Sequence, residues 1–192
     1  MSQTKTLPHA VPPPLHPTKS NPIQFVSIIS RTDKPLYIQS FLPDSDSGSE
    51  SGSHSLSLSP SAMNQFLKFN FFSHMALDIF TSPTSLSLRE QQQQGDSADG
   101  ILLLFIQDQV IVYGYESNNG LKIIVGVDQK VSVQLDALSK FIKDVYRLYL
   151  RRICNPFRNF GIETRSSIED KEDEALNSPK FHNKVKELVE NF

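Results

Sequence analysis

The hydrophobic positions of this chain fall into five short strand-like runs and three stretches with helical spacing. The runs are rich in β-branched and aromatic residues and are bounded by turn-forming residues. They cover Ile23 to Ser30, Leu36 to Phe41, Ile101 to Gln107, Val110 to Glu116 and Leu121 to Asp128. Because only short polar turns part the last three, we expect them to form an antiparallel meander. The turn from Arg31 to Pro35 likewise predicts an opening hairpin.

Helical spacing is clearest from Gln134 to Ile153, and the apolar residues there predict an amphipathic helix that covers the sheet. They are Leu135, Leu138, Phe141, Ile142, Val145, Leu148 and Tyr149. A last helix is predicted after Ser178, its N-terminal cap, with Pro179 in its first turn and its end at Asn191. We expect this helix to pack only weakly at the edge of the fold, through Phe181, Val185, Leu188 and Val189.

The helix predicted from Ala62 to about Phe80 is apolar over much of its circumference. One stripe is expected to face the sheet, and it comprises Phe66, Phe69, Phe72, Ala76 and Phe80. A second, neighbouring stripe comprises Leu67, Phe71, Met75 and Ile79. A surface helix needs only one such stripe. The second stripe either enters the core of the domain or forms a docking face for another subunit, and the sequence leaves both interpretations open.

In chain order the elements read β-β-α-β-β-β-α-α. This order predicts an α+β domain, a five-stranded antiparallel sheet with helices packed on it, as in the longin or profilin-like fold. Residues 1–22 hold six prolines and are predicted to be a disordered leader, and 23–192 form the domain. Two low-complexity stretches, at about 43–60 and 82–99, are expected to be insertions into a smaller scaffold.

Composition excludes several classes of function. A net charge of -2 argues against a nucleic-acid binder. The single cysteine cannot form a disulfide within the chain, which favours a reducing, cytoplasmic compartment. No apolar run is long enough for a signal peptide or transmembrane segment, so membrane contact would be peripheral. There is no phosphate-binding loop, zinc-protease motif or nucleophile elbow, so we expect no enzymatic activity and no cofactor.

Some polar residues admit both a functional and a structural interpretation. Asp78 ends a helix, where a negative charge opposes the helix dipole, and either a partner or a local hydrogen bond would explain it. His74 and Asp78 lie four residues apart but have no third ligand, so we expect no metal site. We expect Cys154 to be a small buried residue rather than a nucleophile or lipidation site.

The end of the long helix and its outward face carry two further features. Asn155-Pro156-Phe157 is expected to end the helix, rather than to act as a peptide signal for endocytic adaptor domains. Basic residues make the outward face of this helix positive, and they are Lys140, Lys143, Arg147, Arg151 and Arg152. Such faces are usually only solvated. A contact with an anionic membrane or an acidic partner is the alternative.

Five segments in the right order resemble the sedlin-type subunits of TRAPP, the tethering and Rab-activating complex of the secretory pathway. They are Thr32 to Ile38, Ala76 to Asp78, Val112 to Tyr115, Gly120 to Ile124, and Asp144 to Tyr149 with the following Asn155-Pro156-Phe157. The Asp33-Lys34-Pro35 turn and the strands at Val112 and Gly120 are most similar to the subunit 2-like branch, associated with TRAPP II. Asn64-Gln65-Phe66 and the segment at Asp144 are closer to sedlin itself.

The resemblance implies a scaffold subunit at one end of the TRAPP core, cytoplasmic and peripheral to Golgi or trans-Golgi membranes. Such a subunit would bind core subunits and a large TRAPP II subunit, and would support nucleotide exchange on a Rab GTPase through the complex. Asp78 corresponds to an acidic residue that sedlin-type subunits use to contact a large partner. The candidate partner-binding residues are Leu67, Phe71, Met75, Asp78 and Ile79. Sedlin itself, or another longin-fold trafficking protein such as a coat adaptor small subunit, is the alternative.

Overall fold

The computed structural model describes residues 21–41, 60–85, 87, 100–155 and 176–192. Its elements are β1 (Ile23–Ile29), β2 (Pro35–Ser40), α1 (Pro60–Thr81), β3 (Ile101–Gln107), β4 (Val110–Glu116), β5 (Lys122–Asp128), α3 (Leu135–Ile153) and α5 (Pro179–Glu190). The predicted strands and helices are therefore confirmed, and so is the α+β class. The predicted leader, apart from Asn21 and Pro22, the first insertion apart from Pro60, and most of the second lie outside the described residues.

The five strands form one antiparallel sheet in the order β2-β1-β5-β4-β3. The first strand pairs with the last, so that Ile28 lies opposite Ile123. Strands β1 and β5 are covered on both faces, which explains why their sequences are almost continuously apolar rather than alternating. The two edges of the sheet are β2 and β3.

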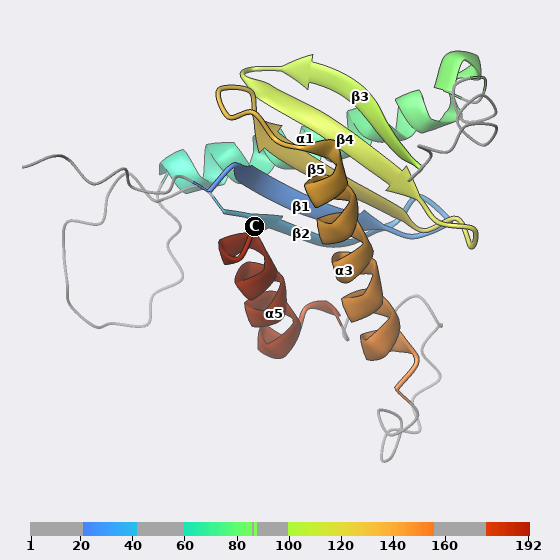
Figure 1. Ribbon diagram of the computed structural model, residues 1–192, viewed down its shortest axis with the longest axis vertical. Coiled ribbons are helices and arrows are strands. Elements are labelled where there is room, and N and C mark those ends of the chain that lie inside the picture. Colours follow the sequence, from blue (N-terminus) through green and yellow to red (C-terminus); the bar gives the residue numbers. More distant parts are fainter. Residues whose placement is uncertain (1–20, 42–59, 86, 88–99, 156–175) are drawn as a thin grey trace, which may run out of the picture.

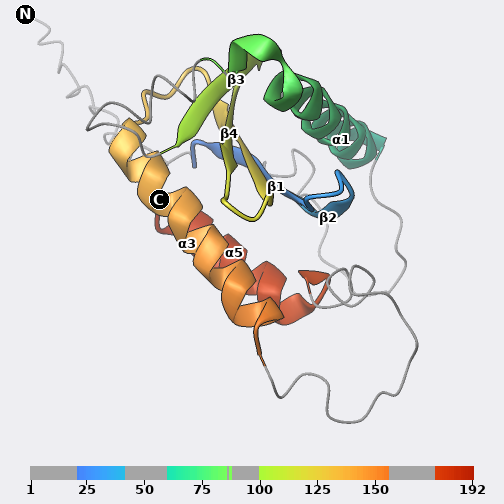
Figure 2. The same cartoon turned by 90° about the vertical axis from the view of Figure 1, so that its right-hand side faces the viewer.

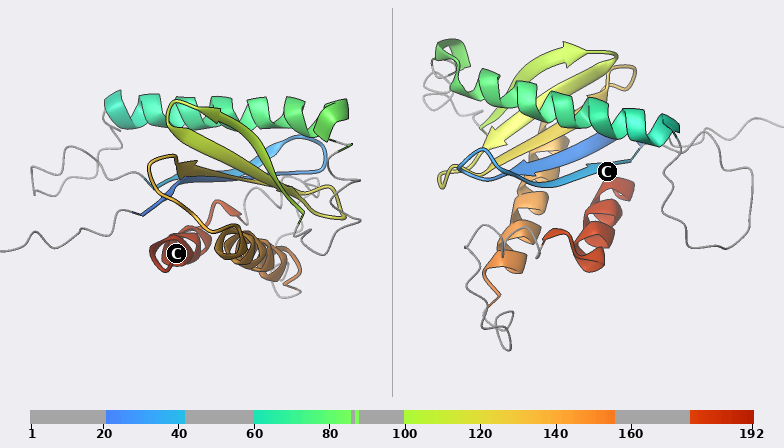
Figure 3. Two further views of the ribbon diagram at one scale, coloured as in Figure 1. Left: turned by 45° about the horizontal axis from the view of Figure 1, so that its top comes forward. Right: turned by 180° about the vertical axis from the view of Figure 1, so that it is seen from behind.

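Helices cover both faces of the sheet, α1 on one and the pair α3 and α5 on the other (Figures 1, 2 and 3). Beneath α1, buried side chains of β1, β4 and β5 meet Phe69, Phe72, Ala76 and Phe80. The ring of Phe25 stacks on that of Phe69, with 4.7 Å between centroids. The larger core lies on the other face, where α3 contributes Leu138, Ile142 and Val145 among others. No helix in the described ranges is both long and apolar enough to cross a membrane.

The prediction that the last helix packs weakly at the edge is wrong. Phe181, Val185 and Val189 of α5 are buried in the same core cluster as α3. The Phe181 ring meets that of Tyr37 edge to face at 5.1 Å between centroids. The side-chain amide of Asn21 donates to the carbonyl of Val189 at 2.9 Å, which ties the end of α5 to the start of β1. The predicted Ser178 cap is confirmed, since its hydroxyl accepts a hydrogen bond from the backbone N–H of Phe181.

A polar network also joins α5 to the edge strand β2. The hydroxyl of Tyr37 donates to the side-chain carbonyl of Gln39. The amide nitrogen of Gln39 lies 2.8 Å from Nε2 of His182, so a neutral His182 accepts this hydrogen bond. Burial, with the positive charge of Lys186 as a smaller cause, lowers the pKa of His182 below its usual range. Neutral His182 is therefore the form that fits the folded state.

This arrangement predicts a small, specific loss of stability in mild acid. Because the folded-state pKa of His182 is lowered, the unfolded chain binds its proton first as the pH falls below about 6.5. The contribution of neutral His182 is thus complete above that pH and is lost as the pH falls toward the folded-state pKa. His182→Gln should flatten the fall in melting temperature between neutral and mildly acidic buffer. His74→Gln, which replaces an exposed histidine on α1, should keep the wild-type profile, and equal profiles for all three proteins would contradict the prediction.

Candidate docking face

The outward side of α1 carries a row of apolar side chains spaced four residues apart. We call this row the α1 outer face, and it comprises Met63, Leu67, Phe71, Met75 and Ile79. Leu67 and Phe71 are 58% and 56% exposed, whereas Met75 and Ile79 are half-buried. At 1.5 Å per residue the row extends over about 24 Å. The structure therefore leaves the N-terminal part of the predicted second stripe accessible and packs its C-terminal part partly against the core.

Phe66 differs from the prediction that placed it in the buried stripe, because it is 43% exposed. The N-terminal end of α1 extends past the sheet (Figure 3), and Phe69 is the first buried residue among the α1 side chains that the structure describes. Phe66 therefore lies beside the accessible part of the α1 outer face, next to Met63 and Leu67. Sequence periodicity could not predict that Phe66 is exposed, since its three-residue spacing from Phe69 is also the spacing of a core residue. Met63, four residues before Leu67, could have been included from spacing alone.

The inner side of α1 is held firmly by rings and by one ion pair. Phe72 packs edge to face on Phe105 of β3, with centroids 5.7 Å apart. The ammonium group of Lys68 lies 5.4 Å from the centre of the Phe72 ring and 3.6 Å from a carboxylate oxygen of Asp108 in the β3–β4 turn. These contacts fix the rotation of α1 about its own axis. The side chains that remain outside, Phe71 above all, are thus presented in a defined orientation.

Asp78 lies near the C-terminal end of α1, and its side chain is exposed. Its carboxylate makes no hydrogen bond or ion pair with any residue of the described ranges, so the local hydrogen bond considered from the sequence is not observed there. The nearby helix carbonyls are instead capped by the Thr81 hydroxyl, which donates to the backbone oxygens of Asp78 and Leu77 at 3.0 and 3.3 Å. No basic residue occurs in the last turn of α1. The charge of Asp78 thus adds to the negative end of the helix dipole, and a cationic group of a partner would relieve it.

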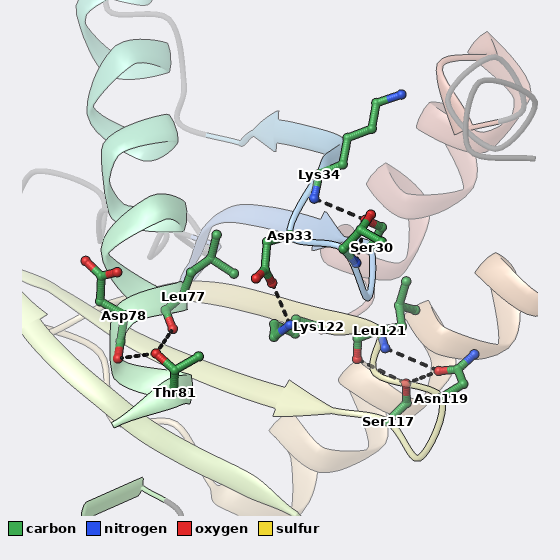
Figure 4. Close-up of polar contacts among 11 residues, drawn as sticks. Ser30, Asp33, Lys34, Leu77, Asp78, Thr81, Ser117, Asn119, Leu121 and Lys122 are labelled. Atoms are coloured by element: carbon green, nitrogen blue, oxygen red, sulfur yellow. Dashed lines mark hydrogen bonds and ion pairs between the residues drawn. The ribbon is translucent and has the colours of Figure 1, made fainter. Parts of the chain in front are cut away.

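Two turns lie at the same end of the sheet as Asp78 (Figure 4). The ammonium group of Lys122 on β5 lies 2.7 Å from a carboxylate oxygen of Asp33 in the β1–β2 turn. Gly120 in the β4–β5 turn has a φ of +83°, and a Cβ there would lie 3.0 Å from Cβ of Arg31. The turn segments that carried the family resemblance therefore contact each other across the end of the sheet.

Other residues singled out in the sequence are placed as follows. Cys154 is exposed at the end of α3, so the prediction of a buried cysteine is wrong. The reason is that the last fully buried residue of α3 is Tyr149, and that the final turn packs on the core only through the partly buried Leu150 and Ile153, so Cys154 follows at the edge of the core. His74 and Asp78 are both exposed on α1. Pro156 and Phe157, which follow Asn155, lie outside the described residues, so the interpretation of that motif stays a prediction.

Comparison with known proteins assigns the family. The sedlin family model matches residues 28–191, which include all five strands, at least in part, and all three helices. The chain belongs to the sedlin family. Its longin-like fold agrees with the sheet and helix order described above.

Several curated relatives of this sedlin-family protein have informative names. It is 30% identical over 159 residues to the TRAPP-associated protein TCA17 of Saccharomyces cerevisiae, an alignment that covers 79% of this chain and 91% of that protein. It is 25% identical over 146 residues to the trafficking protein particle complex subunit 2-like protein of Bos taurus, covering 76% and 89% of the two chains. The Xenopus tropicalis protein of the same name is 26% identical over the same length and coverage. The resemblance to sedlin-type subunits stated from the sequence is thus confirmed.

Proposed function

We propose that this protein is a non-catalytic scaffold subunit of the TRAPP complex, and that it binds its neighbours through the α1 outer face and Asp78. The observation that carries the proposal is the exposure of Leu67 and Phe71 on a helix whose inner side is fully engaged. An exposed apolar row beside an acidic group that has no partner in the described part of the chain is typical of a protein interface. The names of the relatives supply the class of partner, namely other TRAPP subunits.

The finer assignment within the complex is also part of the proposal. Relatives described as subunit 2-like favour the branch associated with TRAPP II over sedlin itself. In that branch the protein would hold a large TRAPP II subunit and act on a Rab GTPase only through the assembled complex. It would lie on the cytoplasmic side of Golgi or trans-Golgi membranes. A coat adaptor small subunit remains the competing function on the same fold.

The direct test is affinity purification of the tagged full chain from its native cells, followed by mass spectrometry. Recovery of the small TRAPP core subunits together with the large TRAPP II subunits is the expected result. Recovery of core subunits alone would assign the protein to the sedlin branch. Recovery of adaptor chains, or of no stable partner at all, would overturn the proposal.

Asp78→Tyr should selectively weaken binding of the large subunit. The substitution removes the negative charge at the exposed end of α1 and adds a bulky ring, but no described side chain depends on that carboxylate. We therefore expect a loss of at least about tenfold in recovery of the large subunit, because the contact loses a charge and gains a steric clash. The melting temperature of the isolated protein should stay close to wild type. Asp78→Asn, which removes only the charge, is the matched variant, and a wild-type level of recovery with Asp78→Tyr would contradict the assigned role.

A further inference from the structure

A basic groove lies on the opposite side of the sheet from α1, between the C-terminal end of α3 and the N-terminal half of α5. Its volume is about 420 Å³. The groove is lined by Leu148 and Phe181 and by four cationic side chains, those of Arg151, Arg152, Lys180 and Lys184, and none of the described residues that line it is acidic. Two helices that are distant in the sequence thus bring their positive charges to one apolar-floored groove.

The charges of the two helices are distributed unevenly along their length. Among the described residues, acidic side chains lie toward the ends remote from the groove, with Asp136 in the first turn of α3 and with Glu187 and Glu190 at the end of α5. Asp144 is engaged with Arg147 at 2.8 Å. Arg151, Lys180 and Lys184 make no ion pair with a residue that the structure describes. The layer formed by α3 and α5 is therefore most strongly positive at the end that carries the groove.

The positive surface continues from the groove along the outward side of α3. Lys140, Lys143 and Arg147 lie on the same solvent side of this helix as Arg151. From Lys140 to Arg151 this row spans about 17 Å. Figures 2 and 3 show α3 and α5 side by side as the outermost layer of that face. A charge that spreads over a two-helix layer fits an extended anionic surface better than it fits a single acidic peptide.

We propose that the groove and the basic row of α3 bind the phosphorylated headgroups of an anionic membrane. Arginine forms paired hydrogen bonds with phosphate oxygens, and lysine supplies mobile point charges around them. The floor of Leu148 and Phe181 accommodates the apolar side of a headgroup within the groove. Basic side chains near an anionic lipid surface each add to the attraction. Since this layer is opposite the α1 outer face, the protein can contact a membrane and a protein neighbour at the same time.

The test is co-sedimentation of the full chain with lipid vesicles. Vesicles of phosphatidylcholine alone are compared with vesicles that also contain phosphatidylserine or a phosphorylated phosphatidylinositol. The full chain is used with every kind of vesicle. The acidic stretch at 169–174, which precedes α5 in the sequence, is therefore always present. We expect binding to both anionic vesicles, decreasing as salt is raised, and little binding to phosphatidylcholine alone.

Two charge-matched variants make the test specific. Lys180→Glu with Lys184→Glu should weaken binding to anionic vesicles by about tenfold or more, since two attractive charges become repulsive. Arg31→Glu with Lys130→Glu changes the net charge equally, but in loops outside the α3–α5 layer, and should weaken it far less. Equal weakening by both variants would mean that only net charge matters and would overturn the proposal. Binding of a soluble acidic peptide at the groove without vesicle binding would also overturn it. Vesicle binding is measured without TRAPP subunits, so a failure of this proposal would leave the proposed TRAPP function untouched.

Discussion

Replacing Phe71 by aspartate is expected to release this protein from its subunit complex while the isolated domain stays folded. The Phe71 ring is more than half exposed and lies near the middle of the α1 outer face. Aromatic residues at the centre of an interface commonly contribute more than 2 kcal/mol to binding. An aspartate there would also place an unpaired charge against an apolar partner. Recovery of neighbouring subunits by the tagged variant should therefore fall by at least about thirtyfold.

Leu135→Asp is the matched control for this experiment. Leu135 is 60% exposed, but it lies in the first turn of α3, on the other face of the sheet. An acidic residue in a first turn is favourable to the helix dipole, so the variant should fold normally and retain its partners. Loss of the thermal transition by Phe71→Asp would show that Phe71 supports the core instead. An equal loss of partners in both variants would contradict the docking role of α1.

Gly126→Ala is expected to destabilise the domain by about 3 kcal/mol and to lower its melting temperature by on the order of 10 °C. Gly126 on β5 lies opposite Phe25 on β1. A Cβ at this position would lie 2.1 Å from a ring carbon of Phe25. The ring cannot move aside easily, because it is buried and stacked on Phe69. Thermal or denaturant unfolding of the purified chain measures the effect.

A double-mutant cycle with Phe25→Leu would show whether the ring is the cause. If the clash with Phe25 is responsible, Gly126→Ala should cost much less in the Phe25→Leu background, and the two effects should not be additive. An equal cost in both backgrounds would place the cause in the backbone of β5. This outcome would contradict the steric explanation.

The elements of the fold could be predicted from sequence because their signals are local. Short apolar runs, turn residues and the cap at Ser178 each depend on a few neighbouring positions. The pairing of β1 with β5 could not be predicted in this way, because strands so far apart carry no local sign of their contact. The burial of α5 was underestimated for the same reason. Its apolar face is short, and only the folded chain shows that Tyr37 and α3 lie against it.

The candidate docking face was only partly predictable. Two apolar stripes on α1 were visible in the sequence, but periodicity cannot tell where a helix extends past its sheet, as it does at Phe66. The accessibility of Phe71 likewise depends on the rotation of α1, which distant contacts such as that of the buried Phe72 with Phe105 of β3 determine. The basic groove could not be predicted from the sequence at all. Arg151 and Lys184 come together only because α5 returns to the end of α3.

The central position of β1 in the sheet has a consequence for synthesis of the chain on the ribosome. Ile29 is paired with Lys122, so one side of β1 has no strand partner until β5 has been made. At usual elongation rates that interval is on the order of 5–20 s, and during this time an apolar strand of the nascent chain has an open edge. Both low-complexity stretches lie between β2 and β3, so each lengthens the interval. The nascent domain should therefore depend on chaperones that shield strand edges, and more so than a relative with shorter loops at these two positions.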